Sequence, residues 1–159
     1  MKLIKRWFCV GFFWLLWPAL RVYLHGSHRS RVLIIRGTEA LLIRDHSKIY
    51  FDTDRWTIPG GGVQRHETPA QAAARELAEE LSMQVDPADL QFLGTRRTGS
   101  YGLRYTGHFF VLRVSGDVSY VQRSREVAEV RWLPLAGLNA GTAKTEARHA
   151  LDLLHQTSA

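Results

Sequence analysis

A glycine-rich turn that leads into a capped, acidic helix is the feature that most constrains this chain. The turn is Pro59-Gly60-Gly61-Gly62, where the glycines let the backbone approach a ligand closely. Thr68 is a good helix N-cap, with Pro69 at the first helical position and Gln71 completing a capping box. The sequence therefore predicts a helix over residues 68–83 that begins at a defined place behind the turn.

The predicted helix has two chemically different faces. Four apolar residues fall within about 60° of one another and form the face expected to be buried: Ala70, Ala74, Leu77 and Leu81. Glu76, Glu79 and Glu80 share a face beside or opposite it, where like charges repel by about 0.2–0.5 kcal/mol per neighbouring pair. Such an oxygen-rich cluster suits a hard divalent cation such as Mg²⁺. The alternative is a solvated helix face helped by Arg65 and Arg75, and the glycine turn before the helix favours the cation site.

Short apolar runs separated by turns predict the remaining elements. A hairpin is expected from residues 32–35 and 40–43, and a second, amphipathic helix from residues 142–156. The other predicted strands are 56–58, 90–97, 105–114 and 127–133. Strands and helices mixed in this order predict an α/β domain with a mixed sheet between helices.

The segment Gly61–Met83 resembles the Nudix box, whose pattern is G-x5-E-x7-R-E-U-x-E-E-x-G-U with U an apolar residue. Every fixed position of this pattern but one is matched, and Ser82 stands where the family has glycine. The matching residues are Gly61, Glu67, Arg75, Glu76, Leu77, Glu79, Glu80 and Met83. Glycine there would allow a left-handed backbone where the helix ends. Serine either adopts that conformation at a cost of about 1 kcal/mol or lets the helix run another half-turn.

The resemblance covers about residues 31–155, because residues 56–59 and 126–138 are also similar to this family. It implies an α/β/α sandwich with a mixed β-sheet. A hydrophobic N-terminal helix, which the resemblance does not cover, is expected to precede this domain. It also implies hydrolysis of the pyrophosphate bond of a nucleoside diphosphate linked to another group. In that reaction, water activated by Mg²⁺ or Mn²⁺ attacks phosphorus.

Carried over by position, the resemblance also implies a set of metal ligands. Glu79 and Glu80 would be the principal ligands, together with the carbonyl of Gly60. Glu76 would act as general base or as a further ligand. Glu126 occupies a place where some members supply another ligand, and a surface acid at a strand edge is the alternative for it.

Two further groups of residues are candidates for the catalytic site. The resemblance implies that Arg75 pairs with Glu67 and holds the glycine loop against the helix. Around the predicted hairpin turn, Arg96, Tyr101 and Arg104 belong to a basic and aromatic cluster that would grip phosphate and stack on a base of the substrate. An exposed hairpin that carries charge for solubility is the alternative interpretation.

Composition excludes several other function classes. Hydrophobic residues make up 45% of the 159-residue chain, which excludes wholesale disorder, and the single cysteine, Cys9, excludes a disulfide framework. Residues 1–36 hold seven Lys or Arg and no acid, whereas residues 37–159 hold 14 basic and 15 acidic residues. The net charge of +6 therefore sits at the N-terminus, and no specific nucleic-acid partner is expected. No P-loop lysine or nucleophile-elbow serine is present.

The N-terminal segment, residues 1–30, is expected to lie outside a catalytic domain that spans 31–159. Its apolar run, residues 7–20, is flanked by basic residues and would rise only ~21 Å as a helix, short of the ~30 Å hydrocarbon core. Three interpretations stay open: a helix lying on an anionic membrane surface, a helix packed on the domain, and a single-span anchor or signal. We expect a cytoplasmic protein, which residues 1–24 would attach to a membrane under the first interpretation.

Two hypotheses on function follow from these observations. The first is a Mg²⁺- or Mn²⁺-dependent Nudix pyrophosphohydrolase with a nucleotide-type substrate. The second is a Nudix-fold module at a membrane that binds a nucleotide without hydrolysing it. The complete acidic set of Glu76, Glu79 and Glu80 favours the enzyme. Nucleoside triphosphates, oxidised nucleotides, ADP-ribose, dinucleoside polyphosphates and nucleotide sugars all stay open as substrates.

Overall fold

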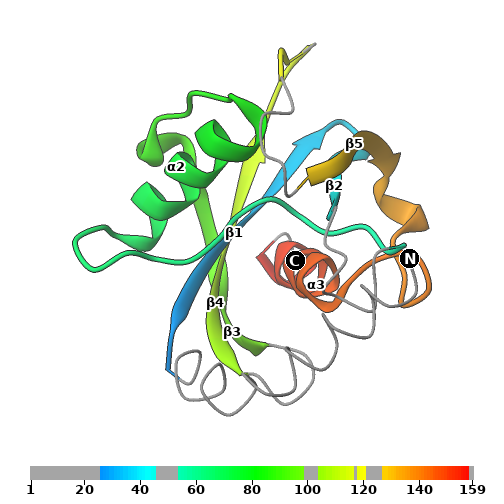
Figure 1. Cartoon of the computed structure of the whole chain (residues 1–159). Coiled ribbons are helices and arrows are strands. Elements are labelled where there is room, and N and C mark those ends of the chain that lie inside the picture. Colours follow the sequence, from blue (N-terminus) through cyan, green and yellow to red (C-terminus); the bar gives the residue numbers. More distant parts are fainter. Residues whose placement is uncertain (1–25, 46–53, 99–103, 117, 121–126, 158–159) are drawn as a thin grey trace, which may run out of the picture.

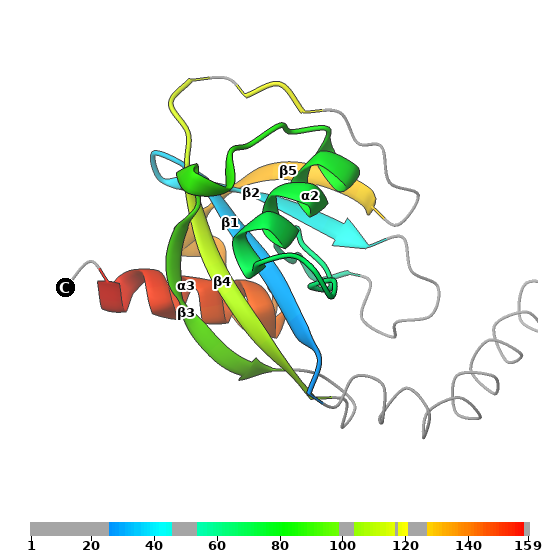
Figure 2. The same cartoon turned by 90° about the vertical axis from the view of Figure 1, so that its left-hand side faces the viewer.

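A computed structural model describes residues 26–45, 54–98, 104–116, 118–120 and 127–157 of the chain (Figures 1 and 2). The predicted N-terminal helix lies outside these residues. Within them, no helix combines the length and the apolar character needed to cross a membrane.

Five strands form one mixed sheet in the order β3-β4-β1-β2-β5. Their bounds are β1 (His28–Arg36), β2 (Glu39–Asp45), β3 (Gln91–Thr98), β4 (Tyr105–Arg113) and β5 (Val127–Pro134). β1 and β4 run parallel, and the other neighbours are antiparallel. The predicted hairpin is confirmed, since Ile34 pairs with Leu41 across β1 and β2. β1 begins at His28, three residues before the predicted start of the domain.

Two helices cover opposite faces of this sheet (Figure 2). They are α2 (Pro69–Leu81) and α3 (Thr145–Thr157), and two short 3-10 helices are η1 (Pro87–Asp89) and η2 (Leu135–Gly137). Because side chains alternate along a strand, Val32 and Ile34 of β1 join the core under α2, whereas Leu33 and Ile35 join the core under α3. The predicted fold class, an α/β/α sandwich with a mixed sheet, is confirmed.

Helix α2 begins as predicted and ends at the position of the missing glycine. The capping box between Thr68 and Gln71 is present. Ser82 adopts a left-handed backbone with φ 57°, and Met83 N donates to Leu77 O at 3.2 Å, so the helix stops there rather than running on. The buried face differs from the prediction, because Ala70 and Ala74 lie at its edge and are only partly buried. Its fully buried residues are Ala72, Ala73, Leu77 and Leu81.

Two predicted boundaries differ from the structure because distant backbone groups pair with one another. The second helix begins at Thr145 rather than at Thr142. Thr142 O accepts from Trp56 N at 2.9 Å and Lys144 N donates to Trp56 O at 2.8 Å, so these groups are not available to a helix. The predicted strand 56–58 is reduced to isolated bridges, one of them between Thr57 and Ile43.

Candidate active site

The glycine loop runs along β1 and is held to it by backbone hydrogen bonds. Val32 N donates to Pro59 O at 3.0 Å, and Ser30 N donates to Gly61 O at 2.9 Å. Gly60 has φ +133°, and a Cβ at this position would lie 2.1 Å from Ser30 O. Only glycine combines that conformation with so close an approach. The loop is therefore fixed against the sheet by residue type as well as by pairing.

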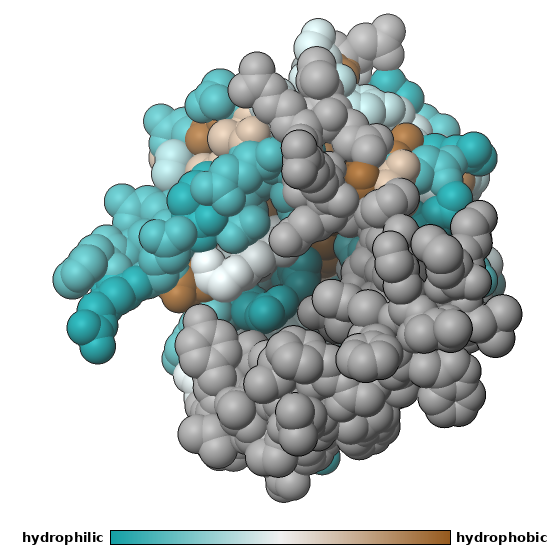
Figure 3. All heavy atoms as spheres, viewed as in Figure 1, coloured by the Kyte–Doolittle hydropathy of each residue, from teal (hydrophilic) through white to brown (hydrophobic). Residues whose placement is uncertain are grey.

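The same loop contacts two of the three helix carboxylates. Gly60 N donates to Glu80 Oε2 at 2.9 Å, and a Cβ on Gly61 would lie 2.3 Å from Glu76 Oε1. Figure 3 shows hydrophilic side chains along the loop before α2, and a mixture of hydrophilic and hydrophobic ones over the helix itself. The turn and the acidic face, which are separate features of the sequence, thus form one unit.

Arg75 connects this unit to the start of α2. Its Nε and Nη2 donate to the two carboxylate oxygens of Glu67 at 3.1 and 2.9 Å, and Nη2 also donates to Gly62 O at 2.9 Å. Its Nη1 donates to Glu76 at 2.9 Å and to Glu79 at 3.1 Å. The hydrogen bonds from Arg75 hold the pKa of Glu67 below its ordinary value. The predicted pair of Arg75 and Glu67 is present, and it holds the loop against the helix.

The surroundings of Glu80 disfavour the charged form of its carboxyl group. Burial raises its pKa to about 7, and the neighbouring carboxylates of Glu76 and Asp45 act in the same direction. The guanidinium of Arg31 and the N–H of Gly60 oppose the rise without cancelling it. A cation beside this group would favour its charged form.

The three carboxylates all come from one helix, α2. They offer only oxygen atoms, which are the ligands that a hard divalent cation prefers. In the described part of the chain, no three acidic, histidine or cysteine side chains converge into a preformed metal cluster. The Glu79 side chain is 58% exposed and lies toward Arg75. The Gly60 carbonyl, a predicted ligand, accepts a hydrogen bond from Arg31 and keeps a second lone pair. Glu126, the further predicted ligand, lies outside the described residues.

Arg31 is a residue of this site that the sequence analysis missed. Its Nη1 donates to the Gly60 carbonyl and, at 3.5 Å, to the Ile58 carbonyl. Its Nε is buried and has no hydrogen-bond partner among the described residues. Strand alternation places Arg31 on the same face as Leu33 and Ile35, so a charge at a core-facing position of β1 was the signal in the sequence.

A second missed residue, Glu146, lies at the start of α3. Tyr105 donates its hydroxyl to Glu146 Oε1 at 2.7 Å. Burial raises the pKa of Tyr105 to about 12, so the hydroxyl stays a proton donor. The pKa of Glu146 lies below its ordinary value although burial opposes this, because Arg31 and the tyrosine hydroxyl favour the carboxylate. Arg31, Tyr105 and Glu146 thus form a polar group between the sheet and α3.

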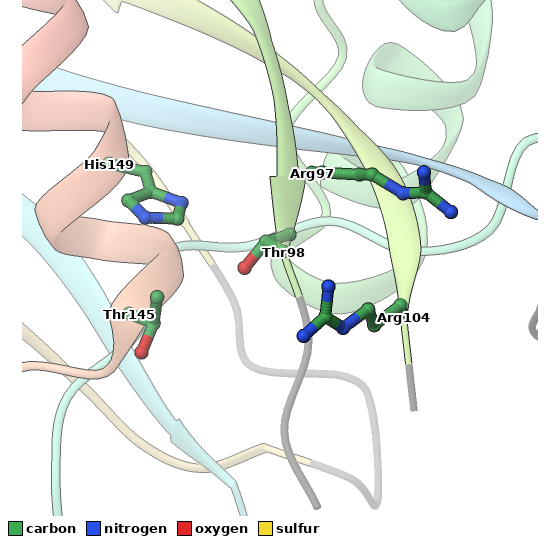
Figure 4. Close-up of a pocket in the computed structure, with 5 residues that line it drawn as sticks. All are labelled: Arg97, Thr98, Arg104, Thr145 and His149. Atoms are coloured by element: carbon green, nitrogen blue, oxygen red, sulfur yellow. The ribbon is translucent and has the colours of Figure 1, made fainter. Parts of the chain in front are cut away.

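The residues predicted to bind substrate have different surroundings. Arg104 lines a cavity of about 290 Å³ at the ends of β3 and β4, beside the first turns of α3 (Figure 4). Arg96 donates to Gln156 Oε1 at 3.0 Å, near the end of α3, and does not line this cavity. Tyr101 lies outside the described residues. The residues that line the cavity are Arg97, Thr98, Arg104, Thr145 and His149.

Comparison with known protein families identifies the family to which this chain belongs. A model of the NUDIX domain matches residues 26–154, which is most of the chain. The chain belongs to the Nudix family. The resemblance inferred from the box is therefore confirmed.

Similar proteins agree with this membership. An RNA pyrophosphohydrolase of Halorhodospira halophila is 34% identical over 98 residues, covering 50% of this chain and 53% of that protein. A MutT NUDIX hydrolase of Burkholderia pseudomallei shares the fold with a TM-score of 0.70 at 19% identity, covering 81% of this chain and 98% of that one. A C. elegans Ap4A hydrolase has a TM-score of 0.66 at 21% identity, with coverages of 83% and 97%. The chain spans about half the length of the curated relatives it matches.

Proposed function

We propose that this Nudix protein is a pyrophosphohydrolase. It cleaves the pyrophosphate bond of a nucleoside diphosphate linked to another group and depends on Mg²⁺ or Mn²⁺. The observation that carries the proposal is the unit formed by the glycine loop and α2, in which Gly60 N–H holds Glu80 and Arg75 contacts both Glu76 and Glu79. The name of the Halorhodospira halophila relative supports the reaction class.

Each residue of this unit has a proposed role. Glu76, Glu79 and Glu80 would hold the cation, which when bound neutralises pyrophosphate charge and promotes the ionisation of water. Glu76, or a neighbouring carboxylate, accepts the proton of the attacking water. Arg75 and Glu67 are positioning residues, because their paired hydrogen bonds fix the loop relative to the helix. Fixed positions matter because phosphoryl transfer depends mainly on orientation and charge stabilisation.

The non-catalytic alternative has no observation in its favour. The relatives include proteins named as hydrolases of phosphate anhydrides, and the acidic set of α2 is complete. Contact of residues 1–24 with an anionic membrane surface stays a prediction, since those residues lie outside the structure's described part.

A substrate panel tests the proposal. The full chain would be incubated with a nucleoside triphosphate, ADP-ribose, a dinucleoside polyphosphate, a nucleotide sugar and a 5′-triphosphate RNA, each with Mg²⁺, Mn²⁺ or chelator. We expect metal-dependent release of a nucleoside monophosphate or its RNA equivalent from at least one of them. Glu79→Gln and Glu80→Gln should each reduce turnover by about a thousandfold, because several kcal/mol of charge stabilisation is lost. Asp89→Asn, at an exposed acid of η1, is the matched control.

Two outcomes would contradict the proposal. One is the absence of metal-dependent cleavage across the whole panel. The other is near-wild-type turnover of both glutamine variants at saturating metal, which would separate any activity from the acidic face of α2.

A further inference from the structure

Two histidines from neighbouring strands meet on one face of the sheet. His28 begins β1 and His108 lies in β4, 80 residues later in the chain. The starts of the two strands lie side by side, and the parallel register pairs Ser30 with His108 (Figure 2). Because side chains alternate along a strand, His28 lies on the same side as Val32, and His108 on the same side as Phe110, both in the core under α2. The fold thus brings together two imidazoles that are far apart in the sequence.

The two imidazole rings approach each other through nitrogen atoms. His28 Nδ1 lies 2.8 Å from His108 Nε2. The ring centroids are 5.1 Å apart and the ring planes are inclined by 19°, so the facing nitrogens are much closer than the ring centres. A hydrogen bond at this distance requires a proton on one nitrogen and a lone pair on the other. In the tautomers that carry their protons on the other two nitrogens, both facing nitrogens present lone pairs to the same point.

This spacing is close to the one that a shared metal ion requires. Zinc binds histidine nitrogen at about 2.0–2.1 Å in tetrahedral sites, which places two ligand nitrogens about 3.3 Å apart. The facing nitrogens of His28 and His108 therefore need to separate by roughly half an ångström. Small rotations of the two side chains are sufficient for this change. Since His28 is exposed, an ion reaches the pair directly from solvent.

The chemistry of the pair selects the class of cation. Burial and the neighbouring His28 lower the pKa of His108, so its ring is neutral at pH 7 and can act as a ligand. Imidazole nitrogen suits Zn²⁺, Ni²⁺ and Cu²⁺, whereas Mg²⁺ prefers oxygen ligands. Within the described part of the chain, no third histidine, cysteine or carboxylate joins the pair, so water would complete the coordination.

We propose that His28 and His108 together bind one divalent transition-metal ion of the zinc type, at a site separate from the carboxylates of α2. The ion would fasten the start of β1 to β4. This end of β1 also supports the glycine loop. His28 O accepts from Val63 N at 2.9 Å, and Ser30 N donates to Gly61 O at the same distance. The bound ion therefore stabilises the strand that holds the loop, without taking part in hydrolysis.

A zinc titration of the full chain tests the site. Zn²⁺ would be added in the presence of excess Mg²⁺, which occupies oxygen ligands, and binding would be followed by calorimetry and by the NMR signals of the histidine rings. His28→Gln and His108→Gln should each weaken zinc binding about tenfold or more, because one of only two protein ligands is lost. Glutamine keeps a side chain that forms hydrogen bonds but does not offer an imidazole nitrogen. His155→Gln, at an exposed histidine in the last turn of α3, is the matched control.

Thermal unfolding distinguishes a metal site from a structural hydrogen bond. An ion that binds only the folded protein raises its Tm, so Zn²⁺ should raise the Tm of wild type and of His155→Gln by a few degrees. The same addition should leave the Tm of His28→Gln and of His108→Gln nearly unchanged. If both variants lower the Tm without metal but bind zinc as wild type does, the pair is a hydrogen bond only and the proposal is overturned.

Metal selectivity provides a second check that is independent of the proposed hydrolase activity. Ni²⁺ should act as Zn²⁺ does, whereas Mg²⁺ alone should not shift the ring signals of His28 and His108. Shifts of the same size with Mg²⁺ would contradict an imidazole site. Turnover with Mg²⁺ should be equal in wild type and His28→Gln, since neither histidine belongs to the carboxylate site. Zinc binding that depends on the pair would stand even if the substrate panel showed no cleavage.

Discussion

Helices α2 and α3 have the same length and cover opposite faces of one sheet, yet their polar side chains find partners in different ways. In α2, the cap, the acidic face and the arginine that contacts it lie within one short segment. In α3, Glu146 has its hydrogen-bond partner only because the sheet brings Tyr105 of β4 to it. The comparison shows that the arrangement at α2 is specified by local spacing, whereas the contact between Tyr105 and Glu146 at α3 depends on tertiary structure.

The largest effect should come from the backbone on which the α2 site rests. Gly60→Ala forces a Cβ into a positive-φ conformation and onto Ser30 O, so we expect a loss of about 3 kcal/mol or more in the free energy of unfolding. Gly62→Ala is the matched control, because a Cβ there meets nothing within 4 Å. Urea unfolding of both variants measures the difference. Equal stability of the two would mean that the loop is not held against β1.

The next largest effect is a pH dependence at Glu80. Its folded-state pKa of about 7 lies above the ordinary value of 4.5, so the folded protein retains a proton that the unfolded chain releases as the pH rises. The metal-free protein should therefore lose on the order of 2 kcal/mol of stability between pH 5 and pH 8. Glu80→Gln should remove most of that loss, and Glu79→Gln, at an exposed carboxylate, should not. Parallel pH profiles of wild type and Glu80→Gln, from urea unfolding with chelator, would contradict this.

On the α3 side, Tyr105→Phe removes the hydroxyl that donates to Glu146. We expect a loss of roughly 1.5 kcal/mol, because a partly buried carboxylate loses one partner and keeps the charge of Arg31 nearby. Tyr120→Phe provides the control, since Tyr120 packs at the edge of the other core, under α2. Thermal unfolding compares the two, and a neutral Tyr105→Phe would mean that the contact between sheet and helix is not stabilising.

The difference between these two helices shows which features could be predicted from the sequence and which could not. The hairpin, α2 with its cap, and the sandwich follow from apolar periodicity and local capping residues, which act over a few positions. The pairing of Glu67 with Arg75 spans eight residues and was also predictable. By contrast, Arg31 contacts Gly60 across 29 residues and Tyr105 contacts Glu146 across 41. Such contacts depend on strand order and register, which spacing along the chain does not specify.

Substitutions in the pair of Arg75 and Glu67 should reduce stability less than Gly60→Ala does. Arg75→Lys keeps the charge but loses the paired hydrogen bonds to Glu67, so we expect a loss of about 1 kcal/mol in stability and a clear loss of metal affinity and turnover. Glu67→Gln should behave similarly, and the double variant should be little worse than either single one. A double-mutant cycle on turnover measures this. Fully additive losses would show that the two residues act separately.

The smallest effect, and the only gain, is expected at the end of α2. Ser82 holds a left-handed conformation that costs a residue with a Cβ about 1 kcal/mol, and its buried Oγ has no partner among the described residues. Ser82→Gly removes both costs, while the greater freedom of glycine in the unfolded chain offsets part of the gain. We therefore expect the free energy of unfolding to rise by about 0.5 kcal/mol, with turnover unchanged because no carboxylate moves. Ser82→Ala is the control, since it removes the hydroxyl but keeps the strained backbone, and it should recover less than glycine does. If Ser82→Gly lowers stability, the helix end does not depend on the left-handed residue, and the local specification of α2 would be weaker than its spacing indicates.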